Sequence, residues 1–353
     1  MSTTAMTEQA ESKRRLSPIV ASLGAPVLGV VIGLLIGAVL MLIADVDPLE
    51  AYKLMLSGAL GGQRQITETL LKTAPLLLIG LGLCVAFRAR VWNIGAEGQY
   101  FMGALLGGLV ALYLPHWPRA ILLLTMLAAG IVGGALWALI PALLKVRARI
   151  NEIISTLMLN YIAILFLTYL ARGPLQEPGG YLPVSARFDP ATRLPLLPGT
   201  RIHAGVLLAF ALVPIVYYLL WHTPLGFRAR AVGSRASVAR YAGINVERII
   251  VFVLLFSGAL AGLAGIIEVS TLHYRLKAGI SAGYGFSAIL VALLGRMNPF
   301  GVAIASLFFA VLIIGAETMH VLAGVPPELA DAIQAIIVLS VLAVDALVRR
   351  RLG

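Results

Sequence analysis

Three consecutive stretches of this sequence decide its fold: AGVLLAFALVPIVYYLLW (residues 204–221), HTPLGFRARAVGSRASVARYAGINVER (222–248) and IIVFVLLFSGALAGLAGIIEV (249–269). The first and third are apolar, and each is long enough to cross a lipid bilayer as a helix. The polar stretch between them holds five arginines against one acidic residue, Glu247. Because loops rich in Lys and Arg stay in the cytoplasm, this pattern predicts two membrane spans joined by a cytoplasmic loop, residues 222–248.

A short helix is predicted inside this loop. Ser234 is a candidate N-cap and Gly243 is a candidate glycine just after the helix end, with Ala236, Ala239 and Ala242 between them. A short, basic helix with a face of small residues, next to a membrane domain, indicates a docking surface for another protein. An ordinary positively charged loop is an equally compatible interpretation.

The composition of the whole chain also indicates a membrane protein. Of its 353 residues, 60% are hydrophobic and 12% are charged, and the mean hydropathy is +0.95. Soluble domains average about 25% charged residues, so the sequence predicts an all-α integral membrane protein. We expect about ten transmembrane helices. The ten apolar runs cover residues 24–44, 68–88, 98–114, 119–144, 152–171, 203–221, 249–270, 281–296, 299–319 and 328–348.

The positive charges predict the topology of these spans. With the N-terminus inside, 17 lysines and arginines fall on cytoplasmic segments and nine fall outside. This bias favours cytoplasmic N- and C-termini and an even number of spans. Eight spans also fit if two short runs do not cross, and the third and eighth runs, which are short, are candidates for broken or re-entrant helices. The net charge of +11 is thus explained by topology and gives no indication of nucleic-acid binding.

The predicted organisation has three parts. Residues 1–23 form a cytoplasmic N-terminal tail, residues 24–348 form the transmembrane domain, and residues 349–353 form a cytoplasmic C-terminal tail. The external loop at residues 172–203 is rich in proline and glycine. It is either a gate or lip that contacts an external partner, or a plain connecting loop.

Glycines spaced by four residues predict closely packed helices. Small residues at this spacing let helix backbones approach one another in lipid. The pattern occurs at Gly29/Gly33/Gly37, Gly103/Gly107, Gly130/Gly134 and Gly258/Gly262.

Catalytic motifs are missing from the sequence. None of the five lysines follows a glycine, so the chain has no Gly-Lys-Ser/Thr phosphate-binding loop. The five histidines are scattered without metal-ligand spacing, and the single cysteine, Cys84, lies in an apolar run. We therefore expect a transport subunit that is not an enzyme and that holds no metal and no cofactor of its own.

Two polar clusters lie within or beside apolar runs. The first, WNIGAEGQY (92–100), holds Asn93, Glu97 and Gln99 and opens the third run. Because polar groups in a membrane are costly, they are candidates for a solute pathway or gate. A cytoplasmic turn, with Glu97 placed near a helix N-terminus, is the alternative.

The second cluster is NEIISTLMLNY (151–161). Asn151 is a candidate N-cap, and Ser155, Thr156 and Asn160 share one helix face with Glu152 because they are spaced by three and four residues. Such a stripe lines a hydrophilic path or holds helices together by hydrogen bonds.

These segments resemble the permease subunits of bacterial ATP-binding-cassette (ABC) importers of the branched-chain amino acid/ribose/nucleoside branch. The closest likeness is to the nucleoside, simple-sugar-type permeases. The stretches that carry the resemblance are FRARVWNIGAEGQ (87–99), NEIISTLMLNY (151–161), ARYAGIN (239–245) with FSGALAGLAG (256–265), and GYGFSAILVALLGRMNPFG (283–301).

The resemblance implies a translocation pathway in the bacterial inner membrane whose ATP and Mg²⁺ are held by a partner. The implied partners are a cytoplasmic ABC ATPase, a second permease in a heterodimer, an external substrate-binding lipoprotein and membrane lipid. The 222–248 loop would be the coupling helix. The residues expected to meet the ATPase are Gly233, Ala239, Arg240, Gly243 and Ile244. Relatives tend to have Asn-Pro after the glycine that matches Gly233, where this chain has Ser234-Arg235-Ala236.

We therefore predict import of a nucleoside-like solute. One alternative is a permease of the same family for ribose, another sugar or a branched-chain amino acid. An alternative of another class is an ion-coupled secondary transporter, which would use isolated intramembrane carboxylates such as Glu268 and Glu317.

Overall fold

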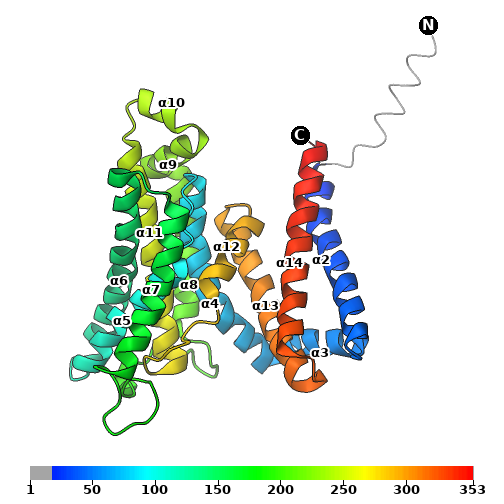
Figure 1. Cartoon of the computed structure of the whole chain (residues 1–353), viewed down its shortest axis with the longest axis horizontal. Helices are drawn as coiled ribbons and strands as arrows, with labels where there is room; N and C mark the ends of the chain where they lie inside the picture. The colour runs from blue at the N-terminus through cyan, green and yellow to red at the C-terminus, as the bar shows by residue number, and fades with distance from the viewer. Residues whose placement is uncertain (1–17, 353) are drawn as a thin grey trace, which may run out of the picture. The chain divides into compact units, whose positions relative to one another are not determined.

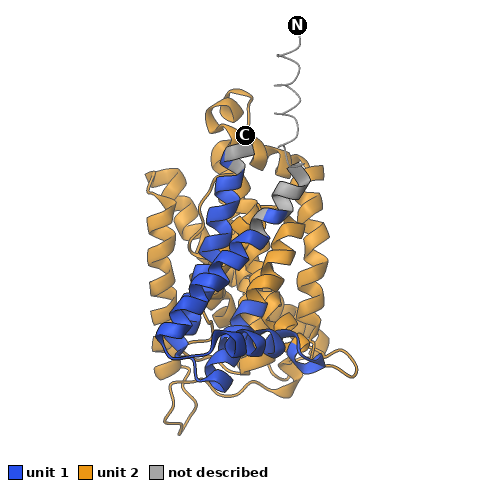
Figure 2. Cartoon of the chain, turned by 90° about the vertical axis from the view of Figure 1, so that its right-hand side faces the viewer, with its two compact units in different colours: residues 1–65, 311–353 blue, residues 66–310 orange. Residues whose placement is uncertain are grey.

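The computed structural model describes residues 18–352, and this part of the chain is mainly α-helical. The predicted tail residues 1–17 lie outside this range. Residues 18–23, the end of the predicted tail, begin helix α2 (Pro18–Ile43), and the boundary between the tail and the first span stays a prediction. Two compact units divide the chain: unit 1 comprises residues 1–65 and 311–353, and unit 2 comprises residues 66–310 (Figure 2).

The helices follow the order of the predicted apolar runs. After α2 come α3 (Pro48–Leu60), α4 (Gln63–Arg88), α5 (Ala96–Tyr113), α6 (Arg119–Ala148), α7 (Glu152–Arg172), η1 (Pro190–Thr192), α8 (Ala204–His222), α9 (Pro224–Ser234), α10 (Ala236–Tyr241), α11 (Val246–Glu268), the π-helix η2 (Val269–His273), α12 (Tyr284–Leu294), α13 (Pro299–Ala323) and α14 (Pro327–Leu352). The described residues contain no β-strand beyond three isolated bridges.

Each of the ten apolar runs coincides with a helix, which confirms the all-α prediction. Seven helices of the described part are long and apolar enough to cross a membrane: α4, α6, α7, α8, α11 with η2, α13 and α14. Helix α12 has 11 residues and rises only about 16 Å, half of the bilayer core of about 30 Å. Its shortness matches the expectation of a broken helix at the eighth run. The count of eight or ten crossings and the cytoplasmic termini stay predictions.

Close packing of α2 against α14 organises unit 1, where the two helices lie side by side (Figure 1). A Cβ atom at Gly33 would lie 2.5 Å from the Cα of Ile337, and Gly29 meets the backbone of Val341 in the same way. Gly37 faces the Tyr52 hydroxyl and the Ile333 side chain. The glycine repeat of the first apolar run therefore serves helix packing, as its spacing predicts.

Helix α3 of unit 1 was not predicted from the sequence. Asp47 caps its N-terminus by accepting a hydrogen bond from the backbone N–H of Leu49 at 2.8 Å, and Pro48 occupies the first turn. Met55 is buried, whereas Leu49 and Leu56 are exposed. With 13 residues, α3 is shorter than the roughly 20 that cross a bilayer, which explains why hydropathy did not reveal it.

Helix α11 of unit 2 packs against both α5 and α6, which also pack against each other. Gly262 faces Gly103 of α5 and Gly134 of α6, while Gly258 faces Gly134 and Gly265 faces the backbone of Tyr100. A Cβ atom at any of these positions would overlap the neighbouring backbone. The predicted glycine pairs therefore meet one another across helix interfaces.

Unit 2 carries α9 and α10 at one end and the 173–203 loop at the other (Figure 1). This loop is fixed to the segment that follows η2. The backbone N–H of Ser185 donates to the carbonyl of Leu276 at 2.8 Å, and that of Phe188 donates to the carbonyl of Tyr274 at 2.8 Å. A salt bridge between Glu177 and Arg275, at 3.6 Å, adds to these contacts.

Replacing Gly262 by alanine is expected to destabilise the protein. The new methyl group would meet the Gly130 carbonyl and the Gly134 backbone, so two helices must separate, at a cost of about 1–3 kcal/mol. The thermal midpoint of the detergent-solubilised protein measures the effect. Gly24→Ala, at a helical position with no atom within 4 Å of the added Cβ, is the control and should not change the midpoint. Equal midpoints for both variants would contradict the packing account.

Candidate functional site

The turn between α4 and α5 is held by a buried amide network. The Asn93 side-chain Nδ2 donates to Gln99 Oε1 at 2.8 Å and to Ser257 Oγ at 2.9 Å. Gln99 Nε2 donates back to Asn93 Oδ1 at 3.0 Å. Asn93 and Gln99 are almost fully buried. The network therefore ties the turn to the first turn of α5 and to the middle of α11.

Helix α7 secures the same turn with its polar stripe. Asn160 Nδ2 donates to the carbonyl of Ile94 at 2.8 Å, and its Oδ1 accepts from the backbone N–H of Gly98 at 2.8 Å. Thr156 Oγ1 accepts from the backbone N–H of Ile94 at 3.2 Å. These two side chains satisfy backbone groups that the irregular turn leaves free, which is what irregular backbone buried in a membrane protein requires.

Glu97 connects α5 to α12. Its Oε2 accepts a hydrogen bond of 2.6 Å from the backbone N–H of Gly285, in the first turn of α12. A carboxylate at this position is favoured by the partial positive charge of the helix N-terminus. Glu97 is only 3% exposed, so this contact is made away from bulk water.

The structure thus brings five of the six candidate pathway residues to one turn, with Glu97 reaching on to α12. Ser155 is buried beside this group and donates only to the carbonyl of Glu152, at 3.3 Å, while Glu152 forms a salt bridge with Lys145. The hydrogen bonds of Thr156 and Asn160 favour the helix-joining interpretation, and a role in the solute pathway stays a prediction. We did not predict Ser257 as a partner, because it is a lone hydroxyl in an apolar run.

The predicted short helix exists as α10, but its start differs from the prediction. Ser234 is the last residue of α9, and Arg235 precedes α10 without a side-chain capping bond. Ser234 as N-cap is therefore wrong: α9, itself capped by Thr223 and started by Pro224, runs up to this point. Gly243 has a φ of 80°, the left-handed conformation expected of a glycine after a helix end.

The five candidate coupling residues occupy different places in the α9–α10 hairpin. Gly233 is buried, and a Cβ there would overlap the carbonyl of Arg88 at the end of α4. Ala239 is also buried, whereas Arg240 is exposed and bonds to Glu247 at 2.6 Å. Gly243 and Ile244 line a groove. Gly233 thus joins the hairpin to a membrane helix, and the groove residues face outward.

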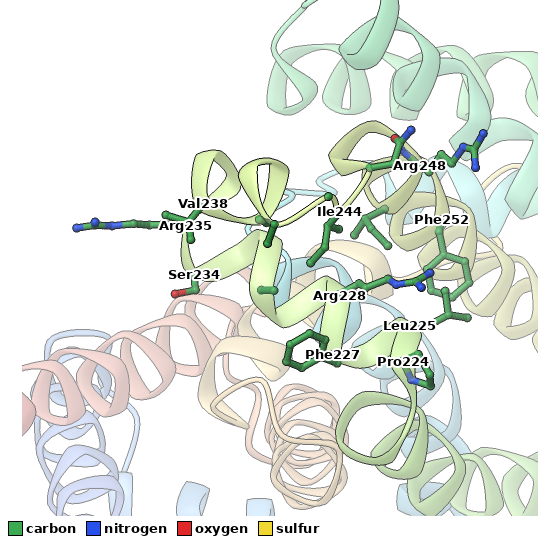
Figure 3. A pocket seen from close by; sticks show the side chains of 16 residues that line it. Pro224, Leu225, Phe227, Arg228, Ser234, Arg235, Val238, Ile244, Arg248 and Phe252 are labelled. Carbon is green, nitrogen blue, oxygen red and sulfur yellow. The ribbon is translucent and has the colours of Figure 1, made fainter.

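The groove lies between α9, α10 and the start of α11 (Figure 3) and has a volume of about 990 Å³. Its wall includes Phe227 and Val238, which are 61% and 56% exposed. Three arginines, labelled in Figure 3, also line the groove: Arg228, Arg235 and Arg248. Exposed apolar side chains among arginines are the composition of a protein-binding surface.

Comparison with protein families shows to which family the chain belongs. The family described as the permease component of the branched-chain amino acid transport system matches residues 65–342. The chain belongs to this family. Its matched region covers unit 2 and most of the second segment of unit 1, whereas α2 and α3 lie before it. No solved structure matches the chain.

Three relatives span most of this permease. The glucose ABC transporter permease protein TsgB13 of Haloferax volcanii is 41% identical over 351 residues, covering 96% of this chain and 92% of its own. The guanosine ABC transporter permease protein NupP of Bacillus subtilis is 34% identical, covering 90% and 92%. A second guanosine permease protein of that organism, NupQ, is 29% identical, covering 75% and 84%.

Glu97→Ala is expected to reduce solute uptake about tenfold or more, because α12 loses the hydrogen bond that fixes its position. A small displacement of a functional site is enough to lower its rate strongly. Membrane insertion should stay near normal, since the change leaves the apolar faces intact. Uptake per inserted chain in cells that lack their own copy measures the effect. Glu50→Ala, an exposed carboxylate in α3, is the control. Unchanged uptake in Glu97→Ala would show that this residue has no part in transport.

Proposed function

We propose that this chain forms the translocation pathway of an ABC importer for a neutral, polyhydroxylated solute, either a nucleoside or a sugar. The observation that carries the proposal is the α9–α10 hairpin, an exposed basic hairpin joined by Gly233 to the end of a membrane helix. Relatives named for glucose and guanosine support the solute class.

The hairpin has the properties of a coupling element that binds an ATPase in the cytoplasm. Tyr241 at the end of α10 is 97% exposed, beside the exposed Val238 of the groove. A partner that docks here and moves the hairpin would move α4 with it, because Gly233 leaves no space between α9 and the backbone at Arg88. Tight packing of this kind transmits rigid-body movement, as coupling of ATP binding to the spans requires.

ATP hydrolysis belongs, in this proposal, to a separate subunit. The sequence has no lysine after a glycine, so it cannot form the usual phosphate-binding loop. ATP and Mg²⁺ would be held by that subunit. The α9–α10 groove, about 990 Å³ in volume, is a suitable place for its docking helix or loop.

The proposed complex contains two further partners, a second permease and an external solute-binding lipoprotein. NupP and NupQ are two different permeases of one organism named for one solute, which supports a heterodimer with a second permease. The ordered 173–203 loop, at the end of unit 2 opposite the hairpin, would receive an external solute-binding lipoprotein. The complex would lie in the cell membrane, the inner membrane if the host is a bacterium with two membranes.

The names of the relatives, rather than the candidate pathway residues, limit the range of possible solutes. A nucleoside-like solute was predicted from the sequence, and a sugar was the alternative. Relatives named for guanosine and for glucose both cover about 90% or more of the chain. A sugar ring is common to both solutes, so we propose that hydroxyl groups are what this permease handles.

Co-purification tests the coupling hairpin. An ATPase and a second permease should be recovered with this chain when the neighbouring genes are co-expressed. Val238→Glu should weaken recovery of the ATPase about tenfold, because it places a buried charge in the docking groove. Ala239→Glu and Gly243→Glu should do the same, although these also strain the hairpin.

Leu182→Glu provides the matched control, since Leu182 is similarly exposed but lies in the loop at the other end of unit 2. Its recovery of ATPase should equal that of the unmodified chain. Equal recovery for Val238→Glu would contradict the hairpin assignment. A chain that purifies alone and still transports after reconstitution would favour the ion-coupled alternative.

A further inference from the structure

A polar cavity opens in unit 2 at the end that carries the 173–203 loop. It has a volume of about 320 Å³ and lies among the start of α4, the end of that loop, the end of α11 and the π-helix η2. Its polar wall is formed by Glu68, Lys72, Arg201, His203, Glu268 and Tyr274. None of these residues is part of the amide network or of the α9–α10 hairpin.

The charges of the cavity balance. Glu68 faces Arg201 at 3.9 Å across its rim. Glu268 interacts electrostatically with Lys72 deeper inside and is only 5% exposed. Carboxylates and cationic groups both line the wall, so neither sign of charge dominates it. The cavity therefore favours a neutral solute that needs many hydrogen-bond donors and acceptors.

Burying the carboxylate of Glu268 costs considerable free energy. A carboxylate at the end of an apolar helix is expensive to bury, and such residues usually serve a pathway. The Tyr284 hydroxyl donates to Glu268 Oε1 at 3.4 Å, a long hydrogen bond. One hydroxyl at that distance leaves most of the carboxylate's acceptor capacity for another donor, such as a solute hydroxyl.

His203 lines the cavity and carries a polar atom without a hydrogen-bond partner among the described residues. The residue is 4% exposed, and its Nδ1 is buried without a hydrogen-bond partner in the part of the chain that the structure describes. Buried polar atoms without partners are rare and need an explanation. Burial lowers the pKa of His203 to about 4. The ring is therefore neutral near pH 7 and carries one donor and one acceptor nitrogen.

The wall next to Glu268 is a π-helix. Residues 269–273 follow α11 directly, and Thr271 and Leu272 of this segment line the cavity. A π-helical turn is rare and occurs frequently at functional sites, because it redirects side chains that a regular helix would bury elsewhere. The left-handed Tyr274, with a φ of 55°, ends the segment, and its side chain also lines the cavity.

We infer that this cavity is a binding site for the hydroxyl groups of one sugar ring, in a free sugar or in the ribose of a nucleoside. The inference rests on the proposed function and names where the permease recognises its solute. Small-molecule sites span about 300–1,000 Å³, so this cavity is suited to a single ring rather than to a whole nucleoside. Carboxylate and imidazole groups together match a diol, which both donates and accepts.

Solute protection of a single cysteine tests the site directly. Cys84 is the only cysteine of the chain and is buried, so Cys84→Ser with Leu272→Cys leaves one reactive thiol at the cavity wall. Membranes holding the complete ABC complex are treated with a membrane-impermeant thiol reagent, with and without excess glucose or guanosine. We expect one of these solutes to slow labelling about threefold or more, as mass action predicts for a mostly occupied site.

Glu50→Cys in the same background is the matched control, because Glu50 is exposed on α3, outside the cavity and outside the 173–203 loop. Its labelling rate should be unaffected by solute. Equal rates with and without solute at Leu272→Cys, in a complex that still imports glucose or guanosine, would overturn the inference and leave the proposed function intact. A complex that imports neither solute would overturn the proposed solute class.

A second pair of variants keeps the inference testable if the cysteine variants do not fold. Glu268→Gln removes the carboxylate but keeps its size, and should lower the maximal uptake rate at saturating, solute-loaded binding protein about tenfold. Glu50→Gln, the same change at an exposed carboxylate in α3, should leave that rate unchanged. Equal rates in the two variants would overturn the inference.

Discussion

Backbone contact between α11 and its neighbours is the constraint on which unit 2 depends. Gly258, Gly262 and Gly265 let α11 touch α5 and α6 without side chains between them. In lipid, where burying apolar groups gives helices little drive to associate, such contact is a main source of cohesion. The same contact fixes the positions of two polar residues of α11. Ser257 bonds to the α4–α5 turn, and Glu268 lines the polar cavity.

The polar groups fall into two sets with different physical roles. Asn93, Gln99 and Asn160 are bonded to protein partners, so they stabilise a buried irregular turn. Glu268 and His203 keep free hydrogen-bonding capacity and line a cavity. Burial alone does not distinguish the sets. The distinction comes from counting the partners of each donor and acceptor, which is why we assign solute contact to the second set.

Much of the fold could be predicted from the sequence, and much of the site could not. Hydropathy located all ten apolar helices, and glycine spacing predicted which faces pack. Helix α3 was missed because it is short and amphipathic, and the N-cap of α10 was misplaced because α9 continues to Ser234. Glu68 and Lys72 lie four residues apart on α4, but they formed no motif with His203, which joins them only when the 173–203 loop folds back.

The most direct measurement is ATP hydrolysis and solute uptake by the purified complex in proteoliposomes, with and without its solute-loaded binding protein. Our account predicts that loaded binding protein stimulates hydrolysis, and that glucose or guanosine enters only when ATP is present. Uptake that continues without ATP and stops when ion gradients are dissipated would contradict the account, because the pathway would then be driven by ions rather than through the α9–α10 hairpin.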